Sequence, residues 1–309
     1  MKFPLPLLTL LLMLLPPLVN AQEFEQVSPK RQQIHEQPVE KLSHLERLED
    51  TLVYLADSMY FSALDESRVD GSYEFIRVFK SLLKDPASFK APLQKLKEKI
   101  SLLEAPDHSF RIYNWEVVRN NVERRYYATI QFANGKLQPL IDISDQVIRG
   151  GQDSVFTAPR WFGALYYNML SREADGHTCY FLLGWNGNSM NSDRKLIEVL
   201  TLDDKGHLQF GAPVFDLLDR GKHVQAQRMI VEYEKGSRLS MNYEADEKRI
   251  ILDHCESRIG DPAKRYTYIP DGTYDGLQWN GQQWVMQENA VQITILKDGE
   301  APVDKPVQR

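Results

Sequence analysis

Two short segments of the chain combine residue types that could bind a ligand. Residues 183–195 read Leu-Gly-Trp-Asn-Gly-Asn-Ser-Met-Asn-Ser-Asp-Arg-Lys, and residues 270–279 read Pro-Asp-Gly-Thr-Tyr-Asp-Gly-Leu-Gln-Trp. Each segment sets glycine, which lets a ligand approach the backbone closely, beside hydrogen-bonding groups and a large aromatic ring. The candidate binding side chains are Trp185, Asn186, Asn188, Asp193, Asp271, Tyr274, Asp275 and Trp279. We predict that the two segments meet at one edge of the domain and form its binding surface; the alternative is that both are ordinary turns whose Trp rings close the ends of the core.

The oxygen-bearing residues of these segments do not follow a metal-binding pattern. A calcium loop needs several oxygens at close spacing and usually a bidentate acid, and neither segment has the order Asp-x-Asp-x-Asp-Gly. The histidines form neither His-x-His nor His-Glu-x-x-His, and Asp253 and His254, as neighbours on a strand, should point to opposite faces. We therefore predict no metal site and no cofactor, with Asn, Asp and Gly serving as turn residues and His254 as a structural histidine.

Acidic residues leave one enzymatic alternative open. Glycoside cleavage needs two carboxyl groups about 5 to 10 Å apart across an open cleft, and Asp253, Asp271 and Asp275 could converge in the fold. The sequence has no Gly-x-Ser-x-Gly motif and no phosphate-binding glycine loop at a strand-to-helix junction. The leading interpretation is a non-enzymatic binding module, and the alternative is a hydrolase acting on glycan or peptide with acidic residues of a 271–275 loop.

The chain has two cysteines, Cys179 and Cys255. Both fall in strand-like sequence, so in an oxidising compartment they could form a disulfide between neighbouring strands, or they could remain separate buried thiols. No Cys-x-x-Cys is present, so the sequence suggests neither a redox centre nor a thiolate zinc site.

Four segments together resemble a known group of proteins. They are the two segments above, residues 161–167 (Trp-Phe-Gly-Ala-Leu-Tyr-Tyr) and residues 251–254 (Ile-Leu-Asp-His), and the Ala21-Gln22 junction adds to them. Through these segments the chain from about residue 110 to 290 resembles uncharacterised exported proteins of Bacteroidota. The group has no established activity, so the resemblance implies a compartment and a source and carries over no catalytic residue.

The elements that must position these residues begin with a helical segment, predicted over residues 37–106. A first amphipathic helix carries apolar residues three and four apart, at Leu45, Leu48, Leu52, Leu55 and Met59. The same spacing predicts a second helix over residues 73–83 and a third over residues 89–103. Between these two, Asp85-Pro86 is typical of a cap followed by a first-turn proline. The three helices should pack on one another or on the domain that follows.

From residue 107 to residue 296 the apolar period changes to two, which predicts a mostly antiparallel β domain and an α+β fold class. Asn134-Gly135 and residues 279–282 are typical of tight hairpin turns. Residues 229–255 predict a three-stranded antiparallel meander, with Met241 and Tyr243 facing the core and Asn242 and Glu244 facing water. A sandwich, a barrel and a curled sheet all fit this pattern.

The two ends of the chain have a different character. Residues 1–21 hold Lys2, an apolar run and then Val19-Asn20-Ala21, the layout of a signal peptide cleaved after Ala21. The apolar run is too short and too rich in proline for a transmembrane anchor. Residues 22–36 are predicted to be a flexible leader and residues 297–309 a disordered tail.

Composition limits the partners. The 42% hydrophobic content is ample for a packed core, and the formal net charge of −6 argues against an electrostatic grip on nucleic acid or an anionic membrane surface. We expect an exported, soluble protein, periplasmic or secreted, without a transmembrane anchor. Its predicted partner is an envelope protein, a peptide or a glycan.

Overall fold

The computed structural model describes residues 43–119, 123–147, 151–203 and 205–291. The predicted signal peptide, leader and C-terminal tail lie outside these described residues. In the described ranges, no helix combines the length and the apolarity needed to cross a bilayer.

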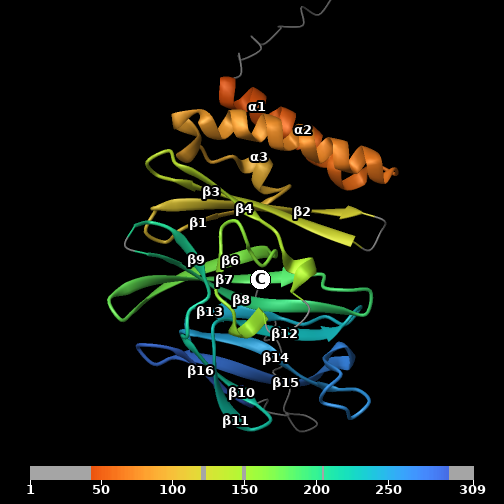
Figure 1. The fold of residues 1–309 in the computed structure, drawn as a ribbon, viewed down its shortest axis with the longest axis vertical. Coiled ribbons are helices and arrows are strands. Elements are labelled where there is room, and N and C mark those ends of the chain that lie inside the picture. The colour runs from red at the N-terminus through yellow and green to blue at the C-terminus, as the bar shows by residue number, and fades with distance from the viewer. Residues whose placement is uncertain (1–42, 120–122, 148–150, 204, 292–309) are drawn as a thin grey trace, which may run out of the picture. The chain divides into compact units, whose positions relative to one another are not determined.

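Helices form the first layer of the described chain, and three mostly antiparallel sheets follow it (Figure 1). One hydrophobic core lies between the helices and the first sheet, a second between the first and second sheets, and a third between the second and third sheets. The α+β class and the mostly antiparallel pairing are therefore confirmed. None of the three sheets closes into a barrel within the described residues.

Two long helices form the N-terminal layer, α1 (His44–Phe61) and α2 (Asp65–Lys84). Ser43 and Glu46 form a capping box that satisfies free N–H groups at the start of α1. The predicted apolar stripe of α1 is confirmed, since Leu52 and Met59 are fully buried against the first sheet. The helix α2 begins at Asp65, earlier than the predicted start at Tyr73.

The predicted three helices are present, but the bounds of 89–103 predicted for the third are wrong. The chain forms a 3-10 turn, η1 (Pro86–Phe89), a single helical turn, α3 (Gln94–Lys97), and then a strand, β1 (Ser101–Glu104). Pro92 explains the break, because proline cannot donate a helical hydrogen bond and disfavours helical geometry in the residue before it. Leu93 adopts a left-handed conformation with φ of 46°, which no continuous helix would allow.

The first sheet has the order β1-β2-β3-β4, with β2 (Phe110–Arg119), β3 (Glu123–Phe132) and β4 (Leu137–Ile141). Side chains alternate along β2, so Tyr113 and Trp115 face the helices while Ile112 faces the second sheet. The predicted turn at Asn134-Gly135 is confirmed, with Gly135 at φ of 84° and Asn134 accepting the N–H of Lys136. A further 3-10 turn, η2 (Ser144–Gln146), follows this sheet.

The second sheet is buried on both faces. Its order is β5-β9-β8-β7-β6, and β12 also pairs with β8. On β7, Leu182 faces the first sheet and Phe181 and Leu183 face the third, so the strand reads as a continuous apolar run. The bounds are β5 (Phe156–Thr157), β6 (Leu165–Ala174), β7 (His177–Asn186), β8 (Ser192–Leu202), β9 (Leu208–Phe210) and β12 (Met229–Glu234).

The third sheet has the order β11-β10-β16-β15-β14-β13, antiparallel except where β10 runs parallel to β16. On β13 the predicted faces are confirmed, because Met241 is 1% exposed, Tyr243 packs against the core, and Asn242 and Glu244 are exposed. The bounds are β10 (Phe215–Asp219), β11 (Lys222–Ala226), β13 (Met241–Glu244), β14 (Arg249–Ser257), β15 (Tyr268–Trp279) and β16 (Trp284–Gln287). The turn after Trp279 is confirmed, since Trp279 pairs with Trp284.

The predicted three-stranded meander over residues 229–255 is wrong at its first step. The strand β12 pairs with β8 of the second sheet, whereas β13 pairs with β14 of the third sheet. The turn at Lys235-Gly236-Ser237 therefore carries the chain from one sheet to another (Figure 1). Alternation along a strand reports which face is buried but not which strand is the partner, so this crossover leaves no local signal.

Candidate functional site

The first candidate segment uses most of its polar groups inside the protein. Asn186, at the end of β7, is buried and donates its side-chain N–H to the carbonyl of Gly163 at 2.6 Å. The ring of Trp185 lies 5.0 Å from the guanidinium carbon of Arg124. These contacts hold the end of β7 against neighbouring parts of the protein.

The turn between β7 and β8 is equally occupied. Asn188 donates to Ser192 Oγ at 2.8 Å and to Glu232 at 3.2 Å, and Asp193 pairs with Lys235 at 2.8 Å. These contacts join the turn to β12.

The second candidate segment is not a loop, which corrects the predicted 271–275 loop. Asp271, Tyr274, Asp275 and Trp279 all belong to β15. Asp253 pairs with Tyr274 while Cys255 pairs with Pro270, so His254 alone lies opposite residues 271–273. This β-bulge needs glycine at its centre, where Gly272 has φ of 92°.

The bulge brings two carboxylates to one histidine. His254 Nδ1 lies 2.8 Å from Asp275 Oδ2, and His254 Nε2 lies 3.9 Å from Asp271 Oδ2. Asp275 also accepts the N–H of Asn289 at 3.3 Å, and its side chain is 5% exposed. Asp271 accepts the N–H of Thr273 at 2.9 Å and its hydroxyl at 2.8 Å, which holds the bulge in place.

The charges around this histidine shift its pKa. Burial lowers the pKa of His254, but the hydrogen bond to Asp275 and the negative charges of Asp275 and Asp271 outweigh burial and raise it. Burial raises the pKa of Asp271, yet its bonds to Thr273 and the charge of His254 bring that pKa below its usual value. An imidazolium held between two carboxylates is therefore favoured.

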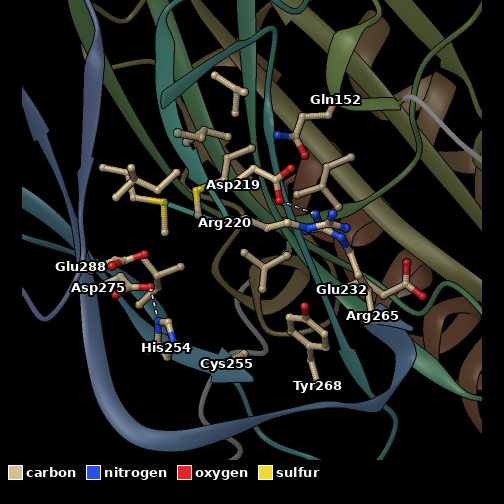
Figure 2. Close-up of a pocket in the computed structure, with 18 of the residues that line it drawn as sticks. Gln152, Asp219, Arg220, Glu232, His254, Cys255, Arg265, Tyr268, Asp275 and Glu288 are labelled. Carbon is tan, nitrogen blue, oxygen red and sulfur yellow. Dashed lines mark hydrogen bonds and ion pairs between the residues drawn. The ribbon is translucent and has the colours of Figure 1, made fainter. Parts of the chain in front are cut away.

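A cavity of about 620 Å³ lies beside this histidine, between β12 of the second sheet and the strands of the third sheet (Figure 2). We call it the β12 cavity. Its apolar lining consists of Leu217, Leu218, Val224, Met229, Ile230, Val231, Leu252 and Met286. Its charged lining consists of Asp153, Asp219, Arg220, Glu232, Asp253, His254, Arg265, Asp275 and Glu288. Gln152, Gln225, Cys255 and Tyr268 complete it, so apolar walls meet a charged rim.

Of the eight candidate side chains predicted from sequence, Asp275 is the one that lines this cavity. Asp271 does not line the cavity but lies beside His254, which does. Trp279 packs against Phe181 and Trp284 in the third core. The two candidate segments lie on different sheets. Asp253 and His254 both line the cavity, although neighbours on a regular strand would point apart, and the bulge at His254 accounts for this.

Sequence reasoning missed His254, Glu232, Arg265 and Glu288 as lining residues. One signal could have found the first of them. A glycine flanked by Asp and Thr inside a strand-like run, as at Gly272, is typical of a β-bulge, and bulges often re-aim side chains beside binding sites.

The two cysteines are free thiols in the structure. Cys179 is buried on β7 of the second sheet, and Cys255 is partly buried on β14 of the third. Burial, with the nearby charges of Asp253 and Asp271, raises the pKa of Cys255 to about 12. Its sulfur is therefore a neutral thiol near pH 7 and not an activated nucleophile.

Within the described residues, no three His, Cys, Asp or Glu side chains converge in a way that could hold a metal ion. No protein-family model, curated protein or solved structure matches this chain significantly. The function must therefore be argued from the cavity and the residues around it.

Proposed function

We propose that this chain is an exported, non-enzymatic binding protein and that the β12 cavity is its ligand site. The observation that carries the proposal is the cavity itself, about 620 Å³ with apolar walls and a charged rim. Ligand pockets in proteins typically measure about 300 to 1,000 Å³ and combine such walls with a few placed polar groups. A cavity of this size admits a short peptide segment or a sugar-sized group, the ligand types expected from the sequence.

The lining residues support binding over covalent catalysis. The described lining residues include no serine or threonine, and their one thiol, Cys255, has its pKa raised to about 12 by burial. Asp275, the most buried acid of the rim, already binds His254 and the backbone of Asn289. A nucleophile activated by a neighbouring base would need a different set of side chains here.

Fragment binding tests the proposed site. Met229 and Met286 line the cavity, whereas Met59 is buried between the helices and the first sheet and Met190 is exposed on the β7–β8 turn. With methyl-labelled methionine, neutral, cationic and anionic fragments should include compounds that shift the Met229 and Met286 signals and leave those of Met59 and Met190 in place.

A cavity-filling variant makes this test specific. Met286→Trp should abolish those shifts at Met229, while Val285→Trp, at the neighbouring position that does not line the cavity, should preserve them. A library that moves no cavity signal, or moves it equally in Met286→Trp, would refute the proposed site.

A hydrolase acting on glycan or peptide is the second candidate, and the His254–Asp275 pair favours it. When the histidine is neutral, an aspartate that orients the ring can prepare it to take a proton from water. Turnover of glycosides or peptides that disappears in His254→Gln and Asp275→Asn would establish the hydrolase. The binding proposal predicts that the unaltered protein leaves such substrates intact.

Export is part of the proposal, supported by the layout of residues 1–21 and by the resemblance to exported proteins of Bacteroidota. The protein recovered from the envelope or medium of its native host should begin at Gln22. Mass spectrometry that finds exported protein with Met1 intact would contradict this.

A further inference from the structure

The lining of the β12 cavity carries an excess of negative charge. Among the described lining residues, six carboxylates face three basic groups, and Arg194, outside the lining, offsets Glu232, so two negative charges remain even when the histidine is protonated. The acids are Asp153, Asp219, Glu232, Asp253, Asp275 and Glu288, and the bases are Arg220, Arg265 and His254. A cleft lined by one sign of charge within apolar walls concentrates ligands of the opposite sign.

Several of these charges already have partners. Asp219 pairs with Arg265 at 3.1 Å, Asp275 with His254 at 2.8 Å, and Glu232 with Arg194 at 3.4 Å. These pairs hold the rim in shape and contribute little net charge for a ligand to use.

Other carboxylates of the rim lie within ion-pair distance of no cation of the described residues, although the charge of Glu288 acts on His254. Glu288 and Asp153 make no ion pair and no hydrogen bond with other described residues, and Asp253 accepts only the backbone N–H of Ser240, at 2.6 Å. Figure 2 shows Glu288 beside Asp275 and His254, away from the Asp219–Arg265 pair. The end of the cavity at Glu288 therefore has a carboxylate that makes no ion pair with the other described residues.

The walls decide what kind of cation fits. Eight aliphatic or methionine side chains line the same space, and burying an apolar group against them is favourable. A bare metal ion would leave these walls unused, and an organic anion would meet the excess of carboxylates.

We infer that the β12 cavity binds an organic cation, an ammonium or guanidinium group on an apolar stem, with the charged group at the Glu288 end and the stem along Met229, Leu252 and Met286. This inference rests on the proposed binding function and names its ligand class. The shared chemistry could be supplied by a free amine or by a basic side chain of a peptide.

Matched probes test the ligand class. The compounds n-octylammonium, 1-octanol and octanoate share one tail and differ in the head group; the capped peptides acetyl-Leu-Lys-Leu-amide and acetyl-Leu-Glu-Leu-amide form the second arm. Calorimetry on the full-length exported protein should show the ammonium bound at least about tenfold more tightly than octanoate or 1-octanol at low salt. The preference should shrink as salt screens the rim, with a Debye length of about 10 Å at 0.1 M. A preference for the Lys peptide that exceeds the one among the octyl compounds would identify a peptide source.

Charge-neutralising variants locate the site. Glu288→Gln should weaken n-octylammonium binding at least about threefold and leave 1-octanol binding unchanged. Glu256→Gln is the matched control, because Glu256 is exposed on β14 and does not line the cavity, so it reports the effect of net charge alone. Equal effects of the two variants, or octanoate binding as tightly as n-octylammonium, would overturn the inference. Equal binding of 1-octanol would leave the proposed function standing and remove only the cation, whereas a cavity that binds none of the probes would refute both.

Discussion

The two cores on either side of the second sheet are built from similar apolar residues, yet they treat their polar groups differently. Between the first and second sheets, Asn114 binds the carbonyl of Ala164 and the N–H of Tyr166, both at 2.7 Å, and Asp142 accepts the N–H of Tyr126 at 3.0 Å. Between the second and third sheets, polar groups line the β12 cavity instead. Buried polar groups stabilise a fold when each has a partner, whereas groups left at a cavity stay available to a ligand.

A second cavity sharpens the contrast. About 430 Å³ in volume, it is lined by residues of β6, β7, β8 and β9 together with residues 175, 203, 212–214, 282 and 283. Both cavities thus involve the boundary between the second and third sheets. At this boundary the chain crosses from the second sheet, at β12, to the third sheet, at β13.

A substitution in the core between the first and second sheets should produce the largest loss of unfolding free energy. Arg228 and Glu198 are both fully buried, with Arg228 Nε 3.0 Å from Glu198 Oε1, and Arg228 also donates to the carbonyls of Ser154 and Phe210. Arg228→Met leaves the Glu198 carboxylate without its cation and should cost about 3 to 5 kcal/mol of unfolding free energy. Urea titration checks this. The double variant Glu198→Leu with Arg228→Met should recover part of the loss, and a double variant no more stable than the single one would contradict this account.

The core between the second and third sheets should be nearly as sensitive where it is closely packed. Met241 is 1% exposed in the third core, so Met241→Ala should cost about 2 to 5 kcal/mol of unfolding free energy. Asn242→Ala, on the water-facing side of the same strand, should change stability by less than about 0.5 kcal/mol. Equal stability of the two variants in a denaturant titration would mean that this part of the core is not packed as described.

At the β12 cavity, the two acids that contact His254 should differ in how much they contribute to stability. Asp275→Ala leaves His254 and the N–H of Asn289 without their acceptor and should cost about 1 to 3 kcal/mol of unfolding free energy. Asp271→Ala should cost less than Asp275→Ala, because Asp271 lies at an exposed position and bonds mainly to its own bulge. Thermal unfolding of both variants tests which substitution costs more. A larger loss for Asp271→Ala would show that the bulge depends more on the bonds between Asp271 and Thr273 than on the His254–Asp275 pair.

The smallest expected effect is a pH dependence carried by His254. Its pKa in the folded protein is raised, so its stabilising contribution is complete below the unfolded pKa of about 6.5 and is lost as pH rises through the folded pKa. Unfolding free energy measured across this window should therefore fall with rising pH more steeply in the unaltered protein than in His254→Gln. Asp275→Asn should flatten the profile in the same way, and an unchanged slope in both variants would assign the dependence to other groups.

Local pattern predicted the parts of the fold that depend on local forces. The stripe on α1, the turn at Asn134-Gly135 and the two faces of β13 follow from side-chain period and turn chemistry. The predicted length of the third helix was wrong, because the apolar spacing of three and four residues was given more weight than Pro92, which interrupts the helix. The spacing of apolar residues alone does not reveal a proline, which cannot donate a backbone hydrogen bond within a helix.

The site was harder to predict, because it depends on which strands become neighbours. The sequence singled out Asp271 and Asp275, and the structure brings both to His254. The cavity beside them needs β12 in one sheet and β14 in another, a pairing that rests on contacts between distant residues. The sequence pattern of Trp185 and Trp279 is shared by core aromatics and by binding aromatics, so residue type alone does not separate the two roles.

The second sheet has both of its faces in hydrophobic cores. Removing either outer sheet would expose a full row of its apolar side chains to water, so the described layers should unfold in one cooperative transition and not peel apart. A ligand in the β12 cavity would then slow amide hydrogen exchange in α1 and α2 as well, since global opening would be the route by which their most protected amides exchange.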